Sequence, residues 1–149
     1  MQAEMQKYWE QFERINNEAF KWSEGLSDDQ LNWRPPGNAT NTMGNLLSHI
    51  LGGVLAGVVE RVGGGSVQRD RSAEFSNPVT RNSLLQRRTE MEGRVRETLE
   101  TLSSADLSRV VRTPVGETTV DRWLINLVSH FSGHMGQVIL TRKLLDGQK

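Results

Sequence analysis

The sequence TVDRWLINLVSHFSGHMGQVILTRKLL, residues 119–145, carries apolar side chains on most sides of a helix. Its apolar positions recur every three or four residues, which is the periodicity of an α-helix. A helix that is apolar on most sides packs against several neighbours. We therefore expect residues 119–145 to form the central helix of a helical bundle. Thr118 and Asp121 resemble an acidic variant of a helix cap at its start.

Three further segments have the same helical periodicity. They cover residues 5–25, 43–62 and 79–102. A capping-box turn at Ser27 and Gln30, followed by the Pro-Pro-Gly run at 35–37, separates the first two segments. Residues 109–117 are too short to predict a strand pair. The sequence therefore predicts an all-α four-helix bundle.

The composition limits the classes of function. A chain of 149 residues fits one domain, so we expect a single domain over residues 1–149. Lys and Arg total 18, as do Asp and Glu, so neither nucleic acid nor a membrane is an expected partner. The absence of cysteine excludes disulfides, thiolate metal sites and a cysteine nucleophile. Without a signal-peptide pattern or an apolar run that would span a bilayer, we expect a cytoplasmic protein.

The three histidines of the chain, His49, His130 and His134, all lie in predicted core helices. His130 and His134 are four residues apart, so they share one helix face with Cβ atoms about 5–6 Å apart. His49 lies near the middle of its own helix, at a depth similar to that of the pair. Three imidazoles leave one position of a tetrahedral metal ion open, which is typical of catalytic sites. The sequence therefore predicts a divalent metal site with His49, His130 and His134 as ligands.

A simpler interpretation makes each histidine a core residue that is hydrogen-bonded to a nearby serine. Three uncompensated imidazoles in one small core are costly, however, and one shared metal ion satisfies all of them. Phe131 follows His130, so the glutamate of a His-Glu-x-x-His peptidase is missing and a peptidase is not expected. Gln137, one turn beyond His134, fits either a role beside the metal or an inter-helix hydrogen bond.

The sequence resembles the DinB/YfiT-like superfamily of metal-binding helical bundles. The matching segments are residues 26–36 with Trp33-Arg34-Pro35, residues 42–50 with His49, and residues 129–138 with His130 and His134. The resemblance spans almost the whole chain and implies that these three histidines are the metal ligands. It also implies an up-down-down-up bundle. The long polar segment 63–78 suits this topology, because it can return along the preceding helix.

The resemblance implies a metal-dependent enzyme acting on a small-molecule substrate. Characterised relatives transfer low-molecular-weight thiols such as bacillithiol, mycothiol or glutathione, so the leading hypothesis is a thiol S-transferase with a thiol cosubstrate. Three imidazoles suit zinc, nickel, iron or cobalt, of which we expect zinc or nickel. A metal-dependent hydrolase that activates water and a non-catalytic metal-binding stress protein are the open alternatives. The sequence identifies no general acid or base.

A homodimer is a further expectation, because relatives of this type are often dimers. Tyr8, Trp9 and Phe12 on the first helix would supply aromatic side chains for an interface. A protein-interaction module that uses the arginine-rich helix at 79–102 is the last of the hypotheses on function, because neighbouring glutamates balance the charge of its arginines.

Overall fold

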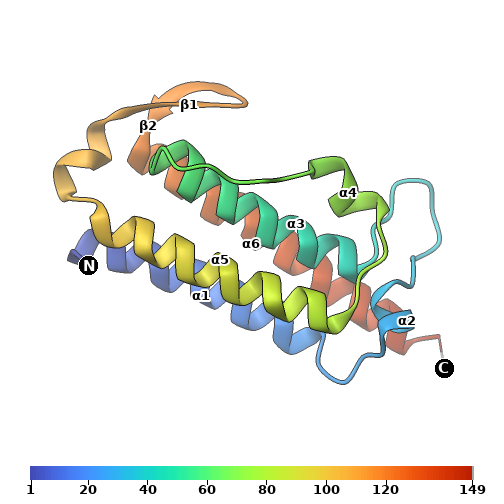
Figure 1. Ribbon diagram of the computed structural model, residues 1–149. Helices are drawn as coiled ribbons and strands as arrows, with labels where there is room; N and C mark the ends of the chain where they lie inside the picture. The colour runs from blue at the N-terminus through green and yellow to red at the C-terminus, as the bar shows by residue number, and fades with distance from the viewer. Residues whose placement is uncertain (149) are drawn as a thin grey trace.

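The computed structural model describes residues 1–148, in which four long helices form a bundle (Figure 1). The long helices are α1 (Ala3–Trp22), α3 (Met43–Leu55), α5 (Arg81–Thr101) and α6 (Val120–Asp146). The shorter helical elements are α2 (Asp28–Leu31), the π-helix η1 (Ala56–Val62), α4 (Arg71–Ser76) and the 3-10 helix η2 (Ser104–Ser108). The helix η1 directly continues α3. The all-α bundle that the sequence predicts is confirmed.

The four long helices run up-down-down-up. In Figure 1, α1 and α6 run from left to right, whereas α3 and α5 both run from right to left. The parallel pair α3 and α5 pack against each other, and the chain between them returns along α3 before α5 begins. This arrangement confirms the topology that the resemblance implies.

The segment between these two helices, residues 63–80, is hereafter called the crossover. Its polar sequence does not exclude regular structure, because the crossover contains α4 and this helix packs against α3. The side chain of Asp70 caps α4 by accepting a hydrogen bond from the backbone N–H of Ala73 at 3.1 Å. Glu74 on α4 is only 5% exposed. The crossover therefore delivers one buried carboxylate to the surface of α3.

The central helix of the bundle is α3, not the expected segment 119–145. Every residue of α3 except Leu55 is buried. On α6, by contrast, Ile125 and Leu140 are each 57% exposed. The expectation is wrong because an apolar composition all around a helix does not require neighbours on every side, and one face of α6 lies at the surface.

A β-hairpin precedes α6, which corrects the expectation that this region has no strand pair. The strands are β1 (Val110–Thr113) and β2 (Gly116–Thr119). They pair antiparallel through a turn at residues 114–115, and Gly116 follows this turn with a φ of +115°. Val111 is buried, and the hairpin packs against η1 and α6. This tertiary packing supports strands that are too short to be stable alone.

The start of α6 is also capped differently from the expectation. Thr118 pairs with Val111 in the hairpin, so the residue that precedes the helix is Thr119. The Thr119 hydroxyl donates a hydrogen bond to the carboxylate of Asp121 and does not cap the helix backbone. The pattern therefore located the start of the helix but named the wrong threonine.

Two further expectations are wrong: that no apolar run is long enough to span a bilayer, and that Trp9 and Phe12 are available for an interface. Residues Met43–Val62 are long and apolar enough to cross a membrane by length and composition, but 83% of the apolar window is buried inside the bundle. That burial is typical of the core helix of a soluble domain. Trp9 and Phe12 are 5% and 0% exposed, so they belong to the core of this chain and are not spare interface residues.

Candidate metal centre

The three histidines lie together where α3 faces α6. One ring nitrogen from each of His49, His130 and His134 lies within 4.8 Å of the other two. The ring centroid of His134 is 4.6 Å from that of His49 and 4.6 Å from that of His130. His49 is buried, His134 is half-buried and His130 is exposed. The structure therefore brings all three predicted site residues into one cluster that opens toward solvent on one side.

The helix geometry explains this convergence. His130 and His134 are one turn apart on α6, and their Nε2 atoms are 3.1 Å apart. His49 reaches them from α3, one turn before Gly53. A Cβ atom at Gly53 would lie 2.1 Å from Cζ of Phe131, so only glycine permits this approach of the two helices. The absence of a side chain at Gly53 thus helps to bring His49 within reach of the α6 pair.

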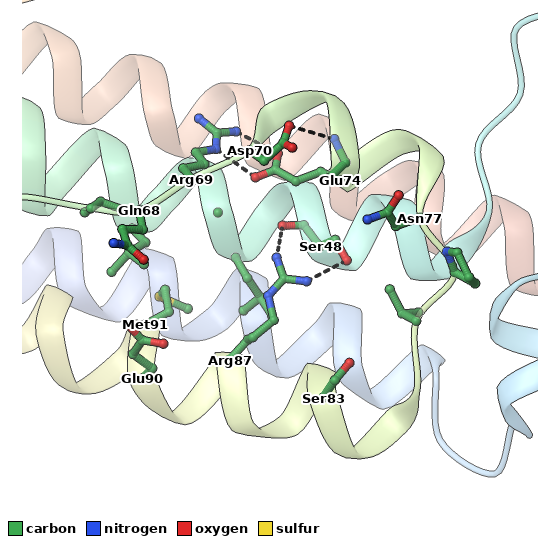
Figure 2. A pocket seen from close by; sticks show the side chains of 17 residues that line it. Ser48, Gln68, Arg69, Asp70, Glu74, Asn77, Ser83, Arg87, Glu90 and Met91 are labelled. Carbon is green, nitrogen blue, oxygen red and sulfur yellow. Dashed lines mark hydrogen bonds and ion pairs between the residues drawn. The ribbon is translucent and has the colours of Figure 1, made fainter.

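Two residues of the crossover fix the orientation of His49. Oε1 of Glu74 lies 3.0 Å from Nδ1 of His49. Because a carboxylate only accepts hydrogen bonds, Nδ1 carries the hydrogen and Nε2 keeps its lone pair. Arg69 donates two hydrogen bonds to the same carboxylate, from Nε to Oε2 at 2.7 Å and from Nη2 to Oε1 at 2.8 Å (Figure 2). This hydrogen-bonded set, Arg69, Glu74 and His49, is hereafter called the clamp.

The clamp keeps Glu74 ionised although it is buried. Burial acts to raise the pKa of Glu74, but the hydrogen bonds from Arg69 and His49 and the charge of Arg69 outweigh burial. The pKa of Glu74 therefore lies below its usual value. An ionised carboxylate behind Nδ1 is the partner that metal-ligating histidines commonly have, and it increases the basicity of the ligating nitrogen.

Gln137 orients His134 in the way that Glu74 orients His49. Its Oε1 lies 2.7 Å from Nδ1 of His134. An amide oxygen accepts, so Nδ1 carries the hydrogen and the lone pair of Nε2 faces the cluster. Of the two interpretations of Gln137, the structure therefore favours the one beside the metal site.

The pKa values of His130 and His134 are both lowered from their usual value. The partial burial of each ring, which removes some of its contact with water, is the largest cause for both residues. The charges of His49 and Arg71 lower both pKa values further, and His134 adds to the effect on His130, whereas the Gln137 hydrogen bond acts in the opposite direction on His134. The neutral imidazole is the form that binds metal ions, so this environment prepares both side chains for ligation.

The cluster borders a cavity of about 290 Å³, hereafter called the site cavity. Its lining includes His49 and His130, the apolar side chains of Trp123, Leu127 and Phe131, the hairpin turn at 114–115, and Arg61, Arg69 and Arg71. Three imidazole nitrogens beside an open cavity match the donor set of a catalytic divalent site, which keeps one position for a small molecule. The residues present therefore fit a divalent transition-metal ion.

Sequence reasoning missed Glu74, Arg69 and Arg71. All three lie in the polar crossover, where no periodicity marks a buried position. Asp70, three residues before Ala73, is a local signal for the short helix α4. No local signal indicates that Glu74 faces a histidine 25 positions earlier in the chain.

An up-down-down-up helical bundle with a three-histidine cluster between its second and last long helices defines a class of metal-binding bundle proteins. Residues 11–138 match the family model of the DinB superfamily, and the chain belongs to this family. No curated protein sequence matches the chain.

Solved structures share the fold at low sequence identity. A conserved protein from Enterococcus faecalis is similar with a TM-score of 0.79 and 14% identity, and 99% of each chain is covered. A DinB-like protein from Bacillus cereus has a TM-score of 0.73 and 15% identity over 91% of this chain and 89% of the other. A DinB-like protein from Bacillus subtilis has a TM-score of 0.69 and 17% identity over 92% and 90%. These likenesses establish the fold alone.

Proposed function

We propose that this protein is a divalent-metal-dependent enzyme that transfers a low-molecular-weight thiol to an electrophilic small molecule. His49, His130 and His134 hold the ion. The observation that carries the proposal is the convergence of three ring nitrogens within 4.8 Å at the edge of the site cavity. Zinc or nickel is the expected ion, and iron or cobalt also suits three imidazoles. A small-molecule substrate and a cytoplasmic location belong to the same proposal.

The residues of the site each have a part in this chemistry. A divalent ion at the cluster supplies a lowered pKa for a coordinated thiol, so that the thiolate is available near neutral pH. Glu74 and Gln137 hold two histidines in the tautomer that turns Nε2 toward the ion. Trp123 and Phe131 supply an apolar wall beside the histidines. The sulfur bonds to a carbon of the electrophile, the thiol proton passes to solvent, and the leaving group departs with the bonding electron pair.

The side chains around the site cavity favour a thiol over water as the nucleophile. No Asp or Glu lines this cavity in the part of the chain that the structure describes. The carboxylate of Glu74 is hydrogen-bonded to His49 and Arg69. A hydrolase commonly uses a carboxylate as general base for water, whereas a thiol deprotonated at a metal ion needs none. The hydrolase is therefore the second candidate.

Metal content tests the site itself. Untagged wild-type protein and the double variant His130→Ala, His134→Ala are analysed by element-specific mass spectrometry after mild dialysis. Ser129→Ala, on the same helix beside the pair, is the control. We expect close to one divalent ion per chain in the wild type and the control, and loss of the ion in the double variant. A wild-type protein that cannot be loaded with zinc, nickel, iron or cobalt would overturn the proposal.

The absorption spectrum of the cobalt-loaded protein tests the thiol. Glutathione, bacillithiol and mycothiol are titrated separately, and a new sulfur-to-cobalt absorption band is expected with at least one of them. The band should be missing from the His130→Ala, His134→Ala variant. If no thiol produces the band and the loaded protein hydrolyses esters or amides without thiol, the hydrolase replaces the transferase.

A further inference from the structure

The site cavity has an uneven charge composition. Three arginines line it, and no acidic side chain among the described residues does. They come from two parts of the chain, since Arg61 lies on η1 whereas Arg69 and Arg71 lie in the crossover. A concave surface with one sign of charge and apolar walls strengthens the field that acts on a bound ion of opposite charge.

The three arginines differ in how far their charges are compensated. Arg69 donates two hydrogen bonds to Glu74, so its charge is paired. Arg61 lies 3.9 Å from Glu60, and both side chains are more than one-third exposed, which makes a weak, solvent-screened pair. Within residues 1–148, Arg71 makes no ion pair or hydrogen bond, and its guanidinium lies 5.5 Å from the centre of the Phe75 ring. Arg71 therefore brings an uncompensated positive charge to the cavity.

The remaining walls of the cavity are suited to an organic molecule. Trp123, Leu127 and Phe131 provide an apolar surface beside the histidines. The turn of the hairpin, residues 114–115, covers another side. A molecule that fits here has an apolar part against α6, a reacting atom at the cluster and an anionic end toward Arg71.

We propose that the thiol bound in the site cavity carries a carboxylate, which Arg71 binds with support from Arg61. This inference rests on the proposed thiol transfer and adds the charge of the substrate. The planar guanidinium of arginine matches a carboxylate with two parallel hydrogen bonds, which gives both orientation and affinity. Arg71 is thus a specificity-determining residue, and the paired Arg69 is not.

The test compares two thiols that differ in one charge. The cobalt-loaded protein is titrated with 4-mercaptobutyrate and with 4-mercaptobutanol, and Kd is taken from the sulfur-to-cobalt absorption band. We expect the wild type to bind 4-mercaptobutyrate about tenfold or more tightly than 4-mercaptobutanol, as for hydrogen bonds to a charged partner. Arg71→Gln should remove most of this preference and leave the Kd of 4-mercaptobutanol unchanged. Arg71→Lys should keep part of it.

Arg96→Gln on α5 is the matched control, because Arg96 is an exposed arginine outside the site cavity. It should bind both thiols as the wild type does. Equal Kd values for the two thiols in the wild type would overturn the inference. A preference that persists in Arg71→Gln and in Arg61→Gln would overturn it too, because another group, such as Arg69 or the cobalt ion, would then bind the carboxylate. If neither thiol binds the cobalt protein, thiol transfer itself fails, which is a different result from equal binding.

Discussion

Two cavities of similar size lie on either side of the Arg69–Glu74 pair, and their charges differ. The site cavity, about 290 Å³, contains three arginines and no carboxylate among the described residues. The second cavity, about 340 Å³, lies between α3, α5 and the crossover (Figure 2). Its lining holds two arginines, Arg69 and Arg87, together with Asp70, Glu74 and Glu90.

The charged groups of the second cavity have partners within the protein. Glu90 lies 3.3 Å from Arg94, and Asp70 caps α4. Arg87 donates hydrogen bonds to the hydroxyl of Ser48 at 3.0 Å and to its carbonyl oxygen at 3.2 Å, which ties α5 to α3 (Figure 2). These polar groups hold the crossover and α5 on the central helix. The two cavities therefore have similar volumes and differ in whether the charged side chains that line them have partners within the protein.

Breaking the clamp should have the largest effect, because the clamp forms the wall between the cavities and orients His49. Glu74→Ala leaves the partly buried Arg69 without its carboxylate, and should lower the free energy of unfolding by about 3 kcal/mol. The affinity for zinc should fall by about 10- to 100-fold, as for other outer partners of ligating histidines. Urea unfolding of the metal-free protein and zinc titration against a chelating dye measure the two effects.

The control for Glu74 is Glu90→Ala, in the second cavity. Its carboxylate is exposed and lies 3.3 Å from Arg94, whose side chain is itself 36% exposed, so the change in stability should stay within about 0.5 kcal/mol. Equal losses of zinc affinity in the two variants would contradict the role of the clamp.

The sequence could predict the histidine cluster because its geometry is largely local. His130 and His134 share a helix face by spacing alone, and the mid-helix position of His49 places it at the same depth. Glu74 could not be predicted, because its contact with His49 depends on how an aperiodic crossover folds back over α3. The hairpin before α6 depends likewise on packing against η1 and α6 rather than on its own four-residue strands. A sequence shows the periodicity of a helix, but it does not show how an aperiodic segment packs against distant parts of the chain.

Adding a methyl group beneath the clamp should lower the free energy of unfolding by less than Glu74→Ala does. A Cβ atom at Gly52 would lie 2.0 Å from Oε2 of Glu74 and 3.2 Å from Nε of Arg69. Gly52→Ala should therefore displace the pair and lower the free energy of unfolding by about 1–3 kcal/mol. Gly93→Ala is the matched control in the middle of α5, where nothing lies within 4 Å of the added atom.

We expect the two alanine variants to change the free energy of unfolding in opposite directions. Gly93→Ala should stabilise the protein by up to about 1 kcal/mol, because alanine is the better helix former. Gly52→Ala should also bind zinc more weakly than the wild type, whereas Gly93→Ala should not. Thermal or urea unfolding of both variants decides the sign, and a neutral Gly52→Ala variant would show that the clamp shifts at little cost.

Removing Arg87, the arginine of the second cavity that does not belong to the clamp, should affect stability alone. Arg87→Gln loses hydrogen bonds to Ser48, and we expect a loss of about 1 kcal/mol. The zinc affinity and the Kd values for both mercaptobutyl thiols should match the wild type. If the affinity for zinc fell as in Glu74→Ala, the two cavities would be coupled through α3 and the contrast between them would not hold.

The smallest effect concerns the pH dependence of the metal-free protein. The pKa values of His130 and His134 lie below the usual 6.5, so the unfolded chain binds protons more readily than the folded one as the pH falls. Their contribution to stability is fully present above about pH 6.5 and is lost as the pH falls through the folded-state pKa values.

Both side chains are partly exposed, so solvent screens the effect and the change in Tm should be small. Thermal melts between about pH 8 and pH 5 should show a steeper decline for the wild type than for the His130→Ala, His134→Ala variant. Equal slopes would show that the two histidines do not cause the decline, because carboxylates such as Glu74, whose pKa is lowered from 4.5, reduce stability only at more acid pH than these melts cover.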